Sequence, residues 1–378
     1  MYWKIPYIHF ARQFKKQQKE YIREFKKVMI KGDFVLRNDV TKFEKKISNF
    51  LKVKYVVSVN SCTDALLFSL GSLGIKKNSE IISVAHTYVA TLAAINHIGG
   101  KPVLADISKD YNINVENIEK LITKKTKAII PVHLYGRSCN MDRIMQIAKK
   151  YKLIVIEDAA QAFGAKFNNK MVGTFGDAGC FSLHPLKSLG GAGDGGFVAT
   201  NNKKLYEKIF RLRNHGQGKR KDGRLQKSRY QIEYFGFNSR LDNLQAAIVN
   251  TKFKLFKNNI SRRKKIASIY SNALKNLPLI LPSSYSDPKY FEVCNSYVIR
   301  TSQQKELFEF LRKKKIEVLI NWSEPLYKHK GLRLKQKLLP NSEKFCKEII
   351  SLPIFPEMSN KEIDFVIKNI KIFYNSTH

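Results

Sequence analysis

Cysteine is scarce in this sequence and never occurs in closely spaced pairs. The five cysteines, among 378 residues, lie far apart, and none belongs to a CxxC motif or to a short His–Cys spacing. Structural zinc sites and disulfide-rich secreted folds both need such spacings. The sequence therefore predicts no metal site and a protein of a reducing compartment, for which we expect the cytoplasm.

Long apolar runs and acidic residues are also in short supply. No apolar run is long enough to cross a bilayer, and the first residues, MYWKIPYIHF, lack the apolar core of a signal peptide. Lys and Arg number 68 against 31 Asp and Glu, which gives a net charge of +37. This charge permits a nucleic-acid partner, but the basic residues are spread along the whole chain without an RNA-binding signature. We expect a basic solvated surface, no membrane partner and no nucleic-acid partner.

What the chain does contain is an alternation of short Val- and Ile-rich runs with helical segments. The runs YVVSVN, EIISVA, KPVLADI, KAIIPVHL and LIVIEDA are separated by helical patterns such as NVENIEKLI and NMDRIMQIAKKY. This alternation is typical of βαβ units on a mostly parallel sheet, in which ligands bind beyond the carboxyl ends of the strands.

The pattern changes near residue 240. A long helical stretch runs to residue 274, and KELFEFLRKKK (a helix), IEVLI (a strand) and a last helix after Met358 follow it. We predict a large α/β domain over residues 1–250, with a helical segment at its start, and a smaller α+β domain over residues 251–378.

Lys187 stands alone in an apolar and glycine-rich stretch, FSLHPLKSLGGAGDGGFVAT. The nearest lysines or arginines on either side are Lys170 and Lys203, although lysines elsewhere come in clusters. A lysine shielded from water has its charged form disfavoured and becomes an amine nucleophile near neutral pH. The run GGAGDGG fits neither the dinucleotide-binding nor the P-loop pattern, so we interpret it as close backbone packing beside Lys187.

Asp158 ends a buried strand in LIVIEDAAQA. A carboxylate there often caps the next helix, but beside a buried lysine it also suits pyridoxal 5′-phosphate (PLP). The lysine forms a Schiff base with the aldehyde, and the aspartate keeps the pyridine nitrogen protonated. The phosphate suits the N-terminus of a helix, which the segment beginning near Thr63 provides. Tyr88 follows another strand, where core packing and stacking on a flat ring are both open.

Longer stretches of the sequence point to one family. CTDALLFSL, TYVATLAAI, TKAIIPVHLYGR, IEDAAQAFGA, FGDAGCFSLHPLK, LRNHG, FNSRLDNLQAAI and SLPIFPEM occur in this order over nearly the whole chain. Their order resembles that of the DegT/DnrJ/EryC1/StrS family of PLP-dependent sugar aminotransferases. The resemblance implies an α/β fold of the fold-type-I aminotransferase class, with a large mostly parallel domain, a smaller C-terminal α+β domain and a homodimer whose active sites lie at the interface.

The resemblance also implies which residues contact the cofactor ring. Lys187 matches the Schiff-base lysine, and Asp158 matches the aspartate on the pyridine nitrogen. Gln161 matches the residue near the ring hydroxyl, and Tyr88 matches the aromatic residue that stacks on the ring.

For the cofactor phosphate, the resemblance implies a second group of residues. Ser182 matches a phosphate-binding serine, and Cys62 and Thr63 match a Gly–Thr pair, so that Cys62 stands where a small residue is usual. Asn238 matches an asparagine that reaches the phosphate from the other subunit.

The substrate side departs further from the family pattern. Asn321, in LINWSEPLYKH, stands where many members have histidine, and Arg37 stands where glycine is common. We expect Asn321, His184 and Arg240 to contact substrate.

The implied reaction moves an amino group from an amino acid, expected to be glutamate, to a nucleotide-diphosphate ketosugar, expected to be a 3-keto-6-deoxy sugar. The cofactor passes through pyridoxamine phosphate. Three alternatives stay open: a 4-keto acceptor, a PLP- or PMP-dependent sugar dehydratase, and a nucleic-acid-binding protein with an inactive enzyme fold. The dehydratases replace the Schiff-base lysine with histidine, whereas Lys187 is in place here.

Overall fold

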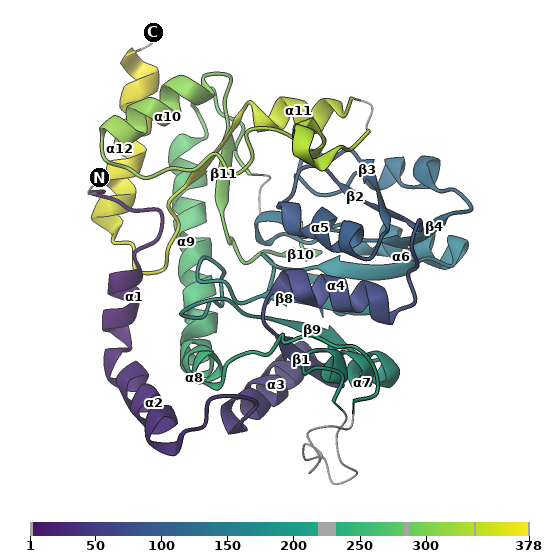
Figure 1. Ribbon diagram of the computed structural model, residues 1–378. Coiled ribbons are helices and arrows are strands. Elements are labelled where there is room, and N and C mark those ends of the chain that lie inside the picture. The colour runs from purple at the N-terminus through teal and green to yellow at the C-terminus, as the bar shows by residue number, and fades with distance from the viewer. Residues whose placement is uncertain (1–2, 218–231, 283–286, 336–337, 377–378) are drawn as a thin grey trace.

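A seven-stranded sheet forms the centre of the computed structural model, which describes residues 3–217, 232–282, 287–335 and 338–376 (Figure 1). The strand order is β1-β9-β8-β5-β4-β2-β3, and only β9 runs against its neighbours, so the predicted mostly parallel sheet is confirmed. The strands are β1 (Tyr55–Val59), β2 (Glu80–Val84), β3 (Lys101–Ala105), β4 (Thr126–Ile129), β5 (Ile154–Asp158), β8 (Ala178–Ser182) and β9 (Gly196–Thr200).

Helices cover both faces of this sheet. Successive residues of a strand point to opposite faces, and in β1 Val57 packs with α4, α5 and α7 whereas Val56 packs with α3 and α8. Ile82 of β2 packs with α6 on that second face. The strands are therefore apolar on both sides, which explains their Val- and Ile-rich runs. These helices are α3 (Asn38–Leu51), α4 (Cys62–Ser72), α5 (Val89–His97), α6 (Met141–Tyr151), α7 (Lys203–Leu212) and α8 (Asn243–Lys252).

A smaller unit packs beside the sheet and contains an antiparallel ribbon of two strands. Its apolar core joins Tyr270, Tyr297 and Phe373 to Ile5 from the start of the chain. Its elements are α9 (Phe256–Leu274), β11 (Tyr297–Arg300), α10 (Gln304–Lys313), α11 (Pro340–Cys346), β12 (Ile349–Leu352) and α12 (Asn360–Ser376). The predicted boundary at residue 250 falls in the last turn of α8 and stays a prediction.

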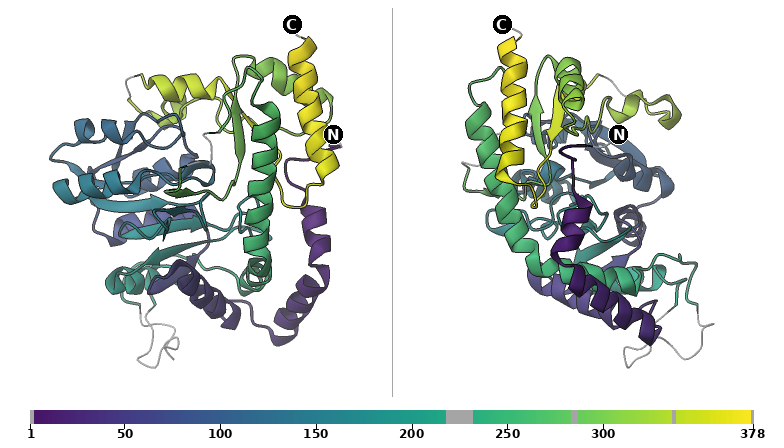
Figure 2. Two further views of the ribbon diagram at one scale, coloured as in Figure 1. Left: turned by 180° about the vertical axis from the view of Figure 1, so that it is seen from behind. Right: turned by 90° about the vertical axis from the view of Figure 1, so that its left-hand side faces the viewer.

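The N-terminal segment runs along this smaller unit before it reaches the large one. Ile5 forms a parallel bridge with Ile316, and the segment from Ile5 to α1 passes beside the smaller unit (Figure 2). Two helices then lead away toward α3, α1 (Phe10–Lys16) and α2 (Gln18–Lys31). A small sheet of β6 (Lys166–Phe167), β7 (Lys170–Met171) and β10 (Tyr290–Phe291) also joins the two units.

Three predicted elements differ from the structure. NVENIEKLI forms only the 3₁₀ turns η1 (Val115–Asn117) and η2 (Glu119–Leu121), because the Asn114 side chain bonds the Glu116 amide and favours a turn. IEVLI forms no strand in the described chain beyond single bridges, since its apolar residues serve core packing. The long helix after residue 240 is broken by η4 (Phe253–Leu255). The other 3₁₀ turns are η3 (Leu134–Gly136), η5 (Leu326–Lys328) and η6 (Lys330–Leu332).

Candidate active site

A cavity of about 600 Å³ opens at the carboxyl ends of the central strands, between the sheet and the smaller unit. It collects most of the side chains predicted from the sequence. The predicted residues that line it are Cys62, Thr63, Tyr88, Asp158, Gln161, Ser182, His184, Lys187 and Asn321. Asn238 and Arg240 do not line it. Asn238 is exposed, and Arg240 donates to Asn214 at 2.9 Å.

Asp158 is buried at the last position of β5 with its carboxylate held from two sides. Thr91 Oγ1 donates to Oδ2 at 2.8 Å, and the backbone amide of Ala160 donates to Oδ1 at 3.2 Å. Burial raises the pKa of Asp158, and the bonds from Thr91 and Ala160 and the nearby Lys187 offset part of this rise. The result is an oriented carboxylate suited to a cationic partner.

Lys187 lies on the segment between β8 and β9 and reaches the same cavity, where it is partly buried. Burial lowers the pKa of its amine, and Cys62 and Asp158 oppose this shift. A lowered pKa increases the fraction of neutral amine at a given pH, which a nucleophile or general base requires. The isolation of Lys187 in the sequence therefore corresponds to a sheltered position in the structure.

The N-terminus of α4 forms another side of the cavity. Ser61 caps the helix by accepting from the Asp64 amide at 3.1 Å, which leaves the first helical residues, Cys62 and Thr63, facing the cavity. The opening amides of a helix have no partner within it and favour an anion. Gly196 of β9 permits this arrangement, since an added Cβ would meet the Ser61 carbonyl carbon at 2.4 Å and the Cys62 nitrogen at 2.6 Å.

Gln161 has an amide orientation that its backbone partner determines. The amide of Tyr135 donates to Gln161 Oε1 at 2.9 Å. Because an N–H can only donate, the carbonyl oxygen of Gln161 faces Tyr135, and its NH₂ group remains a donor for the cavity. Tyr135 adopts a left-handed conformation with φ 57°, an uncommon geometry for a residue with a bulky side chain.

The remaining predicted residues lie closer to the rim. Tyr88 is 66% exposed at the start of α5, so of the two interpretations open for it, core packing is wrong. Ser182 Oγ accepts from the His184 amide at 3.2 Å. Burial and the nearby Lys187 lower the pKa of His184, which favours its neutral form. Asn321 donates to Ser351 Oγ at 3.1 Å from the smaller unit.

Glu157 precedes Asp158 on β5, so its side chain points to the opposite face of the sheet. Its Oε1 accepts from the amides of Phe175 and Gly176 at 2.7 and 2.9 Å. Its Oε2 accepts from the amide of Gly173 at 2.7 Å. Backbone donors thus surround a fully buried carboxylate and attach the turn before β8 to the end of β5.

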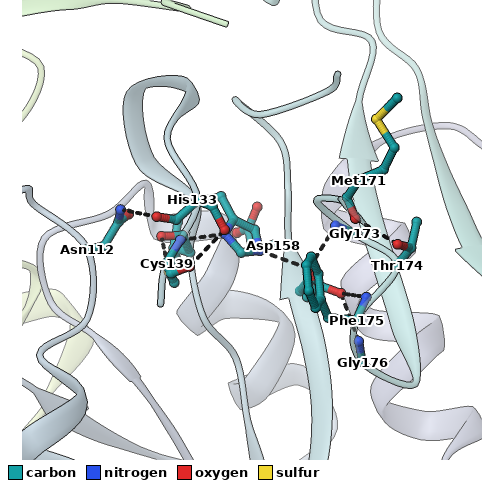
Figure 3. A network of polar contacts seen from close by, with 12 residues as sticks. Asn112, His133, Cys139, Asp158, Met171, Gly173, Thr174, Phe175 and Gly176 are labelled. Carbon is teal, nitrogen blue, oxygen red and sulfur yellow. Dashed lines mark hydrogen bonds and ion pairs between the residues drawn. The ribbon is translucent and has the colours of Figure 1, made fainter. Parts of the chain in front are cut away.

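His133 completes this buried network (Figure 3). Its Nδ1 accepts from the Cys139 amide at 3.0 Å, so Nε2 carries the proton that it shares with Glu157 at 3.1 Å. The backbone amide of His133 donates to the carbonyl of Asp158 at 3.0 Å. The network therefore holds the strand end that carries Asp158.

Sequence reasoning missed several residues of the cavity. Thr91, Tyr7, Asn295, Ser296 and Trp322 all line it. The hydroxyl of Tyr7 donates to Ser296 Oγ at 3.3 Å, although the two residues are 289 positions apart. Thr91, one helical turn after Tyr88, and Trp322, directly after Asn321, lay beside residues that the sequence had already singled out, whereas Tyr7, Asn295 and Ser296 did not.

One cavity brings together a sheltered lysine, an aspartate at a strand end and a helix N-terminus. With the α/β sheet and the smaller α+β unit, this arrangement defines the fold-type-I PLP-dependent aminotransferase class. A sequence profile of the DegT/DnrJ/EryC1/StrS aminotransferase family matches residues 15–371, and the chain belongs to this family. It is therefore an aminotransferase, as the sequence resemblance implied.

Individual relatives are similar to this chain along nearly their full lengths. The chain is 38% identical to dTDP-3-amino-3,6-dideoxy-alpha-D-galactopyranose transaminase of Aneurinibacillus thermoaerophilus, over 97% of this chain and 98% of the relative. It is 35% identical to UDP-N-acetyl-3-dehydro-alpha-D-glucosamine 3-aminotransferase of Acidithiobacillus ferrooxidans, over 95% of both chains. The crystal structure of DesV from S. venezuelae, in complex with a ketimine intermediate, superposes with a TM-score of 0.92 at 30% identity and 98% coverage of both chains.

Proposed function

We propose that this enzyme transfers the amino group of glutamate to C3 of a nucleotide-linked 3-keto-6-deoxy sugar. The observation that carries the proposal is the convergence of Lys187, Asp158 and the N-terminus of α4 on one cavity. The names of the two relatives support the carbon, since both describe amino transfer at position 3 of a nucleotide-linked sugar.

The residues of the cavity fit PLP. The open amides of Cys62 and Thr63, with the hydroxyl of Ser182, would hold its phosphate, and Asp158 would hold the protonated pyridine nitrogen. The NH₂ group of Gln161 would donate to the ring hydroxyl. When bound, PLP supplies an aldehyde that condenses with amines and a ring that withdraws electrons.

Lys187 then has two tasks. With PLP bound, the Lys187 amine would hold the aldehyde carbon until the amine of the donor replaces it, and the freed Lys187 would then take a proton from Cα of the amino acid. Both tasks need a neutral amine, which burial favours by lowering the pKa of Lys187. Asp158 must stay ionised meanwhile, and the bonds from Thr91 and Ala160 favour its charged form. The acceptor ketosugar would take up the amino group by the reverse sequence of proton movements.

An absorbance spectrum of the purified protein, followed by borohydride reduction and peptide mapping, tests this assignment. We expect a visible band that glutamate bleaches and a pyridoxyl label on Lys187. Absence of both, even with added PLP, would overturn the proposal and favour an inactive fold that binds nucleic acid. A panel of 3-keto and 4-keto sugar nucleotides then identifies the carbon, and release of a dehydrated sugar without amino transfer would favour the dehydratase alternative.

We also propose a homodimer in which Asn238 reaches the cavity of the partner. Asn238 is exposed and away from the cavity of its own chain. A groove of about 510 Å³ lies between the N-terminal helices and the Lys187 segment, and its walls include the exposed side chains of Phe10, Phe14 and Phe25. A second copy would cover these apolar groups.

Complementation between two variants tests the shared site. Lys187→Ala and Asn238→Ala are each expected to be weakly active, whereas a mixture contains hybrid dimers with one intact site. Recovery of activity on mixing, together with a dimer in analytical ultracentrifugation, supports the arrangement. A monomer, or a mixture no more active than its parts, contradicts it.

The cytoplasm remains the proposed compartment. All five cysteines are buried, and Cys62, Cys139, Cys180 and Cys346 form no disulfide, which supports a reducing environment. In the part of the chain that the structure describes, no helix has the length and apolar character to cross a membrane, and no three metal-binding side chains cluster.

A further inference from the structure

The segment that carries Lys187 has no regular secondary structure. Residues 183–195 connect β8 to β9 as turns and bends. Backbone bonds inside the segment, such as that from the Lys187 amide to the His184 carbonyl at 2.9 Å, shape its turns, and contacts with other parts of the chain fix it relative to the cavity. Two such contacts come from α8, where Gln245 accepts from the Ala192 amide at 2.8 Å and Lys252 donates to the Gly191 carbonyl at 3.1 Å. Both act several residues beyond Lys187.

Among the hydrogen bonds that tie this segment to another part of the chain, the one nearest to Lys187 in sequence comes from the smaller unit. Ser188, the next residue along the chain, donates through Oγ to Asn295 Oδ1 at 3.2 Å. Asn295 is buried, lines the cavity and precedes β11 by two residues. Ser188 does not line the cavity, so its bond can act on Lys187 without direct contact with a ligand.

Asn295 is itself held by a fixed turn. Arg263 of α9 is buried and donates through Nη1 to the carbonyls of Asn295 at 3.3 Å, Cys294 at 3.4 Å and Ile354 at 3.0 Å. The Val293 amide donates to the Gly136 carbonyl at 3.0 Å, next to the residue that orients Gln161. One turn of the smaller unit thus contacts both the Lys187 segment and the segment that orients Gln161.

We propose that Asn295 is a positioning residue of the smaller unit that holds the Lys187 segment through Ser188. The inference rests on the proposed role of Lys187. Without this bond, the amine samples more positions relative to Asp158, which slows covalent capture of the cofactor and proton transfer. The hydrogen bond from Ser188 to Asn295 acts on the backbone next to Lys187 and leaves the charge of the cavity unchanged.

The test compares Ser188→Ala, Asn295→Ala and the double variant with wild type, all as PLP-loaded full-length protein. Hydrogen exchange of the peptide over residues 183–195, the PLP dissociation constant, and kcat and KM for glutamate are measured. Each single variant should speed exchange and raise the dissociation constant about three- to tenfold, the effect of one lost hydrogen bond. Ser188→Ala should lower kcat more than it changes KM.

Coupling between the two variants is the decisive result. The double variant should be no worse than the poorer single variant, since either change alone removes the bond. Ser188→Thr keeps the hydroxyl and should restore wild-type values. Asn341→Ala is the matched control, because Asn341 donates to the Ile107 carbonyl at 2.7 Å between the same two units and does not line the cavity.

Multiplying effects in the double variant, or unchanged exchange in folded single variants, would overturn the inference. Equal effects of Asn341→Ala would also overturn it, since they would show a general loss of stability. Hydrogen exchange of the unloaded chain separates the two proposals. If wild type fails to bind PLP but the effects of Ser188→Ala and Asn295→Ala on hydrogen exchange are still coupled, the proposed function fails. The positioning role of Asn295 toward the Lys187 segment is then still supported.

Discussion

Asp158 and Lys187 face one cavity but are held by different means. Asp158 ends a strand inside the parallel sheet, with two donors on its carboxylate and the Glu157–His133 network behind it. Lys187 lies on an irregular segment that depends on side chains from α8 and the smaller unit. The carboxylate is thus fixed by regular sheet structure, whereas the amine of Lys187 is fixed by a few side-chain hydrogen bonds from other parts of the chain.

Removal of the lysine should have the largest effect. Lys187→Ala removes the amine that we propose transfers the proton, and general acid–base catalysis contributes about 10²- to 10⁴-fold, so we expect at least this loss in kcat. Lys187→Arg should be as poor, because a guanidinium stays protonated. Single-turnover bleaching of the cofactor band by glutamate measures the loss. Activity within tenfold of wild type would contradict the role of Lys187.

On the strand side, Asp158→Asn should lower kcat by about 10²-fold or more, because a neutral amide cannot hold a protonated pyridine nitrogen. Glu157→Gln, one residue earlier, provides the contrast. It leaves backbone donors poorly matched and should cost about 1–3 kcal/mol of unfolding free energy. The chemistry should change little. Denaturant unfolding and kcat are measured on both variants. The prediction fails if both variants lose mainly kcat, or if both lose mainly unfolding free energy.

Thr91→Val removes one donor from Asp158 with little change of shape. The pKa of Asp158, already raised by burial, should rise further. The ionised carboxylate then persists only at higher pH, so the acid limb of PLP binding should move to higher pH, and affinity at neutral pH should fall several-fold. Titration of the cofactor band between pH 5 and 8 checks this, and an unmoved limb would contradict it.

Lys252 is the anchor of the Lys187 segment whose charge titrates. Burial lowers its pKa to about 8 from 10.5. Between these values the unfolded chain binds more protons, so the contribution of Lys252 to stability rises with pH across that window. Relative to Lys252→Met, wild type should therefore gain stability from about pH 8 to 10.5. Urea midpoints over this range measure the difference, and parallel curves would exclude the titration.

The smallest expected effect concerns the surface. A net charge of +37 should attract a nucleotide diphosphate, so the KM for the sugar nucleotide should rise with ionic strength by a few-fold. The KM for glutamate, with a lower charge, serves as the internal comparison. A flat response for the sugar nucleotide would show that the surplus lysines do not steer the substrate.

The strands of the large sheet and the position of Asp158 could largely be predicted from the sequence. The Val- and Ile-rich runs predict the strands, and LIVIEDA places Asp158 at a strand end, because side-chain burial in a covered sheet requires apolar residues locally. The same reasoning failed for IEVLI, whose burial comes from core packing without strand pairing. Apolar composition reports burial and does not by itself report which backbone groups pair.

The sequence by itself determined the α/β sheet, the sheltered Lys187, the acid at the end of β5 and the helix that opens at Cys62, since each depends on residues adjacent in the chain. Only the tertiary structure decided that Tyr7 and Asn295 reach the same cavity. Tyr7 lies near the start of the chain and Asn295 in its C-terminal part, and no local pattern encodes which distant segments meet. Contacts between remote segments form only when the apolar clusters of the fold pack, so the bond from Ser188 to Asn295 became visible only in the folded molecule.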